Sequence, residues 1–228
     1  MPNPTPHLPL LRRFAALAAI VLLSGCLTIE EHYTFKEDGS GTMEYVLDMS
    51  EVGEMLDNMK GLSDGGDGGS TSDMGEQAKQ LKGVEGIKRV KFKEEKKGYV
   101  QRISFRFQDV AALNRALNVL MPDSTGVQQE FFHWEGNTLV RTNNRHAEEI
   151  GNDMAGGPTA SDTSGIAEML KSMKYKYSFR FAKEVASVEQ ADGVTRESPQ
   201  PNQVELATDW SVIMKDPKAL DLRISVGK

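Results

Sequence analysis

Cysteine is almost absent from this chain, because its 228 residues contain only one, Cys26. A single cysteine excludes an internal disulfide framework and a thiolate zinc cluster. Long apolar runs are also missing, since no stretch after Cys26 approaches the roughly 20 residues that a transmembrane helix needs. Basic residues are fewer than acidic ones, and the net charge of −6 disfavours nucleic acid and an electrostatic hold on anionic lipid.

The motifs of common enzymes are missing too. The sequence has no G-x-S-x-G elbow, no phosphate-binding glycine loop and no H-E-x-x-H zinc motif. After the N-terminal region the histidines are His32, His133 and His146, which lie far apart in the sequence. We therefore expect neither catalytic residues nor a metal or other cofactor.

The segment around the cysteine is informative. Arg12 and Arg13 precede an apolar run of about ten residues, Phe14 to Leu23, a length typical of a signal peptide. Leu23-Ser24-Gly25-Cys26 then has the pattern of a bacterial lipobox. The alternative is an ordinary signal peptide followed by a chance cysteine. The lipobox interpretation makes residues 1–25 a lipoprotein signal peptide and Cys26 the acylated first residue of the mature protein.

This interpretation predicts where the protein resides. Two or more acyl chains, such as palmitate, on Cys26 would hold it stably on a membrane of the cell envelope. Removal of residues 1–25, which hold two arginines and no acid, lowers the net charge from −6 to −8. Leu27 is not the aspartate that retains lipoproteins at an inner membrane, which favours the outer membrane where two exist.

Alternating apolar and polar residues predict strands that bury one face. The first hairpin is expected over 27–49, with a turn at Asp38-Gly39-Ser40-Gly41. Further hairpins are expected over 90–107, with a turn at 96–98, and over 128–142, with a turn at 135–137. Near the C-terminus, strands are expected over 175–181, 204–214 and 220–226.

Helices are predicted between these hairpins. Ser50 and Asp109 are suitable N-caps, and the helix after Asp109 presents Leu113, Ala116, Leu117 and Leu120 on one face. Other helical segments are expected at 74–81 and around 166–173. Flexible segments are expected near 63–73, 143–164 and 190–203, because these are rich in glycine, proline and polar residues. We therefore predict one α+β domain over 26–228, an antiparallel sheet built from hairpins with helices packed largely on one face.

The layout resembles the LppM-like family of bacterial lipoproteins. The resemblance rests on the lipobox, on the strand Leu27 to Phe35 with its Asp38-Gly39-Ser40-Gly41 turn, and on a C-terminal strand Tyr175 to Phe181 followed by a strand around Trp210. The amino-acid sequence of residues 26–49 is also similar to that of uncharacterised lipoproteins of Bacteroidetes-type bacteria. The resemblance implies an α+β lipoprotein domain of undefined activity, and it implies no catalytic residues.

The residues leave three functions open. The first is a non-enzymatic module that binds an envelope protein or an apolar ligand. The second is a lipid-handling module, in which Met55, Met59, Met169 and Met173 line an adaptable apolar groove between helices and sheet. The third is an enzyme whose dispersed site includes residues such as His133 or Asp209. The loop with Asp64, Asp67 and Asp73 is expected to be a linker, although calcium is an alternative.

Overall fold

The computed structural model describes residues 27–51, 53, 74–123, 125–142, 163–216 and 218–227, and no side chains for 163–166. The lipobox, Cys26, Met55, Met59, His146 and the aspartate-rich loop therefore lie outside the described residues. So do the expected flexible segments near 63–73 and almost all of 143–164. Within the described part, no helix is long and apolar enough to cross a bilayer.

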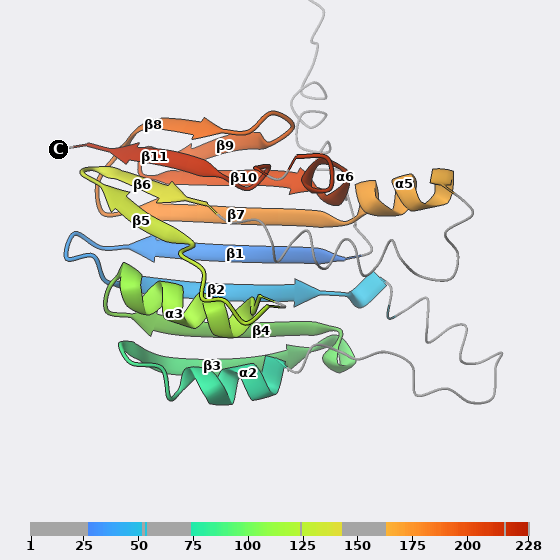
Figure 1. Ribbon diagram of the computed structural model, residues 1–228, viewed down its shortest axis with the longest axis horizontal. Coiled ribbons are helices and arrows are strands. Elements are labelled where there is room, and N and C mark those ends of the chain that lie inside the picture. The colour runs from blue at the N-terminus through green and yellow to red at the C-terminus, as the bar shows by residue number, and fades with distance from the viewer. Residues whose placement is uncertain are drawn as a thin grey trace, which may run out of the picture.

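Two β-sheets form the framework (Figure 1). Sheet A has seven described strands in the order β3-β4-β2-β1-β7-β10-β9, and sheet B has four in the order β5-β6-β11-β8. The strands of sheet A are β1 Thr28–Phe35, β2 Gly41–Asp48, β3 Ile87–Glu95, β4 Val100–Phe107, β7 Lys174–Phe181, β9 Thr195–Gln200 and β10 Gln203–Asp209. Those of sheet B are β5 Phe132–Glu135, β6 Thr138–Arg141, β8 Val185–Gln190 and β11 Leu222–Val226.

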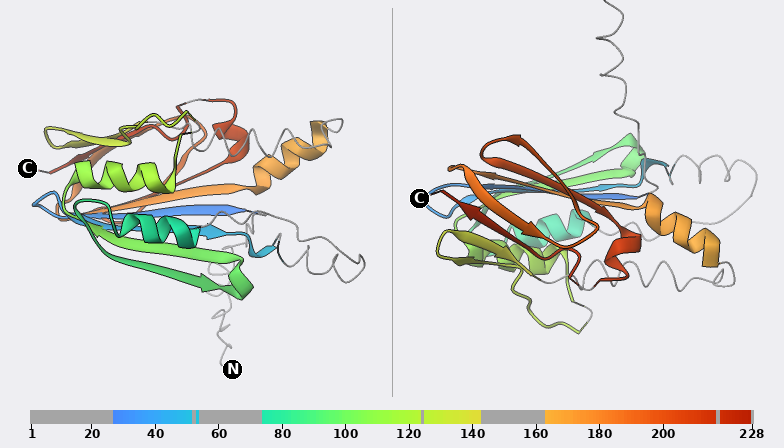
Figure 2. Two further views of the ribbon diagram at one scale, coloured as in Figure 1. Left: turned by 60° about the horizontal axis from the view of Figure 1, so that its bottom comes forward. Right: turned by 90° about the horizontal axis from the view of Figure 1, so that it is seen from above.

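Helices α2 and α3 and sheet B cover the same face of sheet A (Figure 2). The described helices are α2 Met74–Leu81, the 3₁₀ turn η2 Lys96–Gly98, α3 Val110–Leu120, α5 Thr163–Ser172 and α6 Trp210–Ile213. Helices α2 and α3 pack on β3 and β4. Sheet B covers part of the remaining face and shares its core (Figure 2). The apolar side chains of sheet A point into this interior, so the core lies between the two layers.

Several sequence predictions are confirmed. The hairpins β1–β2, β3–β4 and β5–β6 form with antiparallel register, although β5 begins only at Phe132. Helix α2 has the expected bounds, and α3 begins after Asp109, whose side chain accepts a hydrogen bond from the Ala112 amide at 2.7 Å. The four residues of the predicted α3 stripe are all buried.

The first turn shows why glycine is required there. Gly39 has φ of +79°, in the left-handed region that glycine adopts most readily. A Cβ on Gly41 would lie 2.0 Å from the Thr34 carbonyl oxygen and 2.3 Å from the Phe107 ring. Gly41 therefore lets β2 begin directly against the aromatic interior.

The prediction of a purely antiparallel sheet was wrong. Strand β1 pairs with β7 in parallel, with Ile29 opposite Tyr175 and Phe35 opposite Phe181. The hairpin unit β3-β4-β2-β1 thus meets the unit β7-β10-β9 through strands that run in the same direction. Part of the cover is also a second sheet rather than helices, because short strands from 132–141, 185–190 and 222–226 pair with one another.

Two C-terminal predictions were also wrong. The expected strand over 204–214 ends at Asp209, where α6 begins. The Asp209 side chain accepts hydrogen bonds from the Ser211 amide and hydroxyl, which starts the helix and buries Trp210 and Ile213. The flexible segment expected near 190–203 contains strand β9, an exposed edge strand that tolerates Pro199.

Candidate functional site

One end of the two layers holds an open pocket. Strands β1, β7 and β11 end there, and the β5–β6 turn lies beside them. The cavity has a volume of about 520 Å³. It is lined by Phe35, Lys36, Glu37, Asp38, Gly39, Trp134, Gly136, Asn137, Phe181, Ala182, Lys183, Val226 and Gly227. We call it the aromatic pocket.

Three aromatic rings form the floor of this pocket. Phe35 and Phe181 are stacked with centroids 5.6 Å apart, and Trp134 meets them edge-on at 5.9 and 6.3 Å. Phe35 and Phe181 are buried, whereas Trp134 is only half-buried. The indole therefore presents apolar surface to the opening while the two phenyl rings support it from below.

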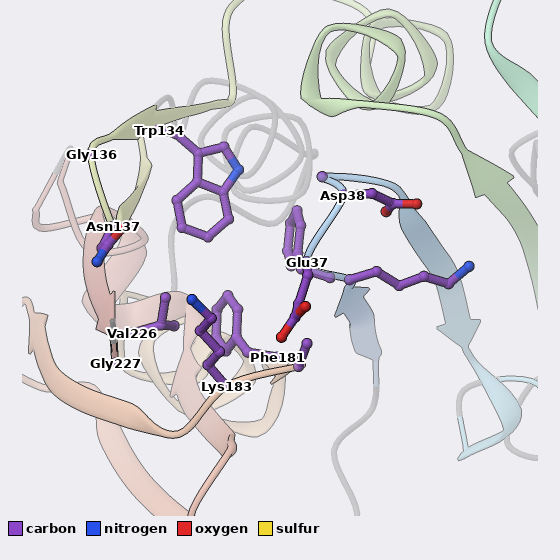
Figure 3. Close-up of a pocket in the computed structure, with 13 residues that line it drawn as sticks. Glu37, Asp38, Trp134, Gly136, Asn137, Phe181, Lys183, Val226 and Gly227 are labelled. Atoms are coloured by element: carbon purple, nitrogen blue, oxygen red, sulfur yellow. The ribbon is translucent and has the colours of Figure 1, made fainter.

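Charged side chains surround the mouth. Figure 3 shows Glu37 and Lys183 on either side of the Phe181 ring, below Trp134. Both are exposed, and neither forms an ion pair with a residue that the structure describes. Asp38 instead accepts hydrogen bonds from the Ser40 amide and hydroxyl, which lower the pKa of its carboxyl group. The mouth thus offers two cations, Lys36 and Lys183, and two anions, Glu37 and Asp38, close to an apolar floor.

Backbone hydrogen bonds hold the walls of the pocket in place. The Val226 amide donates to the Asn137 carbonyl at 3.0 Å, and the Gly227 amide donates to the Glu184 carbonyl at 2.8 Å. On the other side, the Lys36 amide donates to the Ser40 carbonyl at 2.8 Å. The pocket is therefore formed by the fold itself, and a ligand would not need to order its walls.

A buried ion pair lies deeper between the same layers. Glu31 on β1 and Arg141 on β6 are 0% and 2% exposed, with a shortest N–O distance of 3.0 Å. The Glu31 carboxylate also accepts hydrogen bonds from the hydroxyls of Tyr33, at 2.9 Å, and of Tyr175. Arg141 donates to the Leu220 carbonyl at 3.1 Å and lies over the Tyr177 ring. This cluster joins sheet A to sheet B.

The pKa values around this pair are shifted upward. Burial and then the charge of Glu31 raise the pKa of Tyr33 and of Tyr175 far above the usual range. Burial raises the pKa of Tyr177 to about 12. The Glu31 carboxylate keeps the Arg141 guanidinium protonated by raising its pKa, although burial acts in the opposite direction. Tyr33 and Tyr175 therefore stay neutral hydrogen-bond donors to Glu31 at physiological pH.

The outer face of sheet A carries a chain of three polar side chains. The Ser178 hydroxyl lies 2.8 Å from His32 Nδ1, and His32 Nε2 lies 3.2 Å from Glu30. The hydrogen bond from His32, with Lys176 nearby, lowers the pKa of Glu30. Strands β1 and β7, which carry these side chains, lie inside sheet A with a neighbouring strand on each side. Their backbone amides are therefore used in strand pairing. No amide of these strands is left to stabilise an oxyanion.

The structure describes two of the four predicted groove methionines. Met169 on α5 is 36% exposed, and Met173, one helical turn later, is buried in the core at 1%. Met55 and Met59 lie outside the described residues, so a groove shared by all four stays a prediction.

The other residues named from the sequence do not assemble into a site. His133 on β5 contacts Glu135 at 3.3 Å, whereas Asp209 in sheet A caps α6. Across the described ranges, no group of three or more His, Cys, Asp or Glu side chains is arranged to hold a metal ion.

Sequence reasoning missed both the aromatic pocket and the buried ion pair. Glu31 gave a signal, because it lies in phase with Ile29 and Tyr33 on the apolar face of its strand. Arg141 gave a weaker signal of burial, because it follows the apolar residues Leu139 and Val140 in β6. The pocket gave none, since its three rings come from strands whose pairing the alternation does not specify.

Fold and site together describe a two-layer α+β domain with an aromatic pocket at one end. No protein family profile matches the chain, and no curated protein is similar to it. Among solved structures, the NMR structure of the folded domain of LppM from Mycobacterium tuberculosis is similar, with a TM-score of 0.45 and 13% sequence identity. The match covers 91% of this chain and 93% of that one. The likeness to proteins of Bacteroidetes-type bacteria stays a prediction.

Proposed function

We propose that this protein is a lipid-anchored, non-enzymatic binding module of the bacterial cell envelope that holds its ligand in the aromatic pocket. The carrying observation is the preformed floor of Phe35, Trp134 and Phe181, with Glu37 and Lys183 at its mouth. Pockets that combine an apolar floor with a few polar groups are suited to small ligands. The fitting ligand is an amphiphile with an apolar or aromatic group and a charged or polar end.

The position of the pocket supports this function. Strand β1 begins two residues after Cys26 and ends at Phe35 on the pocket floor. Eight residues of strand span roughly 25 Å at about 3.3 Å each. If Cys26 is acylated, the pocket opens at the end of the domain opposite the anchor. The ligand would then be received from the space next to the membrane rather than from the bilayer itself.

A fluorescence titration tests the pocket. The chain has two tryptophans, half-buried Trp134 in the pocket and fully buried Trp210 outside it. The probe is anilinonaphthalene sulfonate, an aromatic anion, added to the full chain. We expect a saturable increase in the emission of the bound probe, a readout that does not depend on Trp134, and at least tenfold weaker binding by Trp134→Ala, which corresponds to about 1.4 kcal/mol.

The matched control is Phe92→Ala, which removes a 36% exposed aromatic side chain that is not part of the pocket lining. This variant should bind the probe as the wild-type protein does. Equal binding by wild type and Trp134→Ala would overturn the assignment of the pocket.

The absence of catalysis is also part of the proposal. Its support is the outer-face chain of Ser178, His32 and Glu30, which has the groups of a hydrolase but no free amide donors from its own strands. A panel of ester, amide and glycoside substrates should show no turnover above that of a Ser178→Ala variant. Turnover by the wild-type protein that disappears in Ser178→Ala would contradict a non-enzymatic role.

The anchor has its own test. Cys26→Ser should abolish labelling by a palmitate analogue and release the protein from membrane fractions. Unchanged labelling and partitioning would refute acylation of Cys26, and they would leave the pocket assignment unaffected.

A further inference from the structure

One edge of sheet A combines an exposed aromatic ring with many cations. Helix α2 packs on strand β3, and a groove of about 340 Å³ lies between them. It is lined by Gly75, Ala78, Lys79, Lys82, Val90 and Phe92. The Phe92 ring is 36% exposed, which is unusual for a large apolar side chain in a described strand. We call Lys82, Lys88, Arg89, Lys91 and Phe92 the basic edge.

The charge of this edge is opposite to that of the whole chain. From Lys79 to Lys97 there are eight lysines and arginines and three glutamates, whereas the chain as a whole carries −6. The four cations of the basic edge are exposed, and none forms an ion pair with another described residue. Their charge is therefore available to an anionic partner.

The basic edge also carries features that are unfavourable for folding alone. Lys88 lies directly opposite Arg106 on β4, and facing like charges destabilise a sheet. The register between β3 and β4 shifts after Lys88, and Arg89 has φ of 57°, a left-handed conformation that costs energy for a residue with a Cβ. An anionic surface bound to this edge would relieve the charge repulsion.

We propose that the basic edge is a docking surface for an anionic lipid bilayer. A bilayer fits better than a soluble polyanion, because Val90 and Phe92 offer apolar side chains beside Lys82 on the helix-covered face of this edge strand. Lys88 and Lys91 extend from its other face, so a membrane that meets the edge can contact both groups. Basic residues beside them are attracted to acidic headgroups. Net charge argues against such binding, but a local cluster dominates at the surface because salt screens distant charges.

The position of the edge agrees with an anchored domain, and in this respect the inference rests on the proposed acylation of Cys26. Strand β3 is three strands away from β1 in sheet A, roughly 14 Å at about 4.8 Å per strand. The acyl chains and the basic edge can therefore reach one bilayer together. The domain would lie on its side, with the aromatic pocket open beside the membrane.

Vesicle flotation of the full chain carrying Cys26→Ser tests the proposal without the acyl anchor. The probes are vesicles of phosphatidylcholine alone and of an equal mixture with phosphatidylglycerol. We expect binding to depend on phosphatidylglycerol and to weaken as salt rises. Lys88→Glu/Lys91→Glu should lower this binding at least tenfold, and Phe92→Ala should lower it severalfold.

The matched control is Lys215→Glu/Lys218→Glu, which makes the same change in net charge at two exposed lysines elsewhere. It should keep the preference for phosphatidylglycerol. Equal loss in both double variants, or no preference for the anionic vesicles, would overturn the proposal. So would binding to heparin without binding to vesicles, which would identify a soluble polyanion as the partner. Acylation of Cys26 is tested separately by labelling, so each of the two proposals, the lipid anchor and the basic edge, can be refuted without the other.

Discussion

Glu31 and Arg141 are the residues whose burial most needs an explanation. Removing two charges from water is costly, and the cost is offset only where every polar atom finds a partner. Glu31 accepts hydrogen bonds from Arg141, Tyr33 and Tyr175, and Arg141 also reaches the Leu220 carbonyl. Nε of Arg141 has no partner among the described residues. The pair therefore specifies how sheet B sits on sheet A more than it stabilises the fold.

A double-mutant cycle tests this interpretation. Glu31→Leu or Arg141→Met alone should lower the free energy of unfolding by about 3–5 kcal/mol, because each leaves a buried charge without its partner. Combining both substitutions removes both charges and should cost less than either single change. Urea denaturation measures these values. Additive losses in the double variant would show that the two charges do not act as a pair.

The sequence predicts part of this cluster. Alternation along β1 places Glu31 on the apolar face, so its burial could be foreseen. Its partner could not, because Arg141 is 110 residues away and on another sheet. For the same reason, the predicted hairpin over 128–142 did not indicate the contacts of Trp134 with Phe35 and Phe181. Each ring belongs to a different strand unit, and only the pairing of the units brings them together.

At the scale of elements, local signals predict helices and strands well. The α3 stripe and its Asp109 cap depend on residues within one turn, and both are found as expected. The sequence predictions fail where the structure of a segment depends on residues far away in the chain. Alternation identifies β1 and β7 as strands but does not say that they pair in parallel. Strand β9 has no buried residue at all, so no apolar pattern reveals it.

The cap of α3 gives a prediction at this scale. Asp109→Ala removes the acceptor for the Ala112 amide and should lower the free energy of unfolding by about 1 kcal/mol. Asp109→Asn keeps an acceptor and should lose much less. Thermal and urea unfolding followed by circular dichroism measure both. Equal losses in the two variants would mean that the side-chain charge, rather than the hydrogen bond, stabilises the helix.

At the scale of the whole molecule, three functional features lie at different places on the two layers. The aromatic pocket lies where β1 ends, the chain leaves toward Cys26 where β1 begins, and the basic edge runs along β3 at one side of sheet A. The predicted α+β class is correct in outline, but the described structure has more strand than helix and part of the cover is a second sheet. Alternation predicts the β5–β6 hairpin and β11, but it could not reveal that these strands leave the main sheet and pair with β8 to form a second one.

Alkaline pH should unfold the molecule as a unit. Burial raises the pKa of Tyr177 to about 12 and those of Tyr33, Tyr45 and Tyr175 above the usual 10. The folded state therefore binds more protons than the unfolded state above pH 10, and its stability falls as pH rises through 10 to 12. Phenolate absorbance and circular dichroism should change together in this window. Ionisation of these tyrosines without unfolding would contradict their burial.

The most direct test of the central claim is an NMR titration of the two tryptophan indole N–H signals. Trp134 lies in the aromatic pocket, and Trp210 is fully buried outside its lining, so each molecule carries its own control. The full chain is titrated with small-molecule extract of bacterial envelopes. We predict that the Trp134 signal shifts and saturates while the Trp210 signal stays in place. No shift of Trp134, or equal shifts of both signals, would contradict a ligand site at the aromatic pocket.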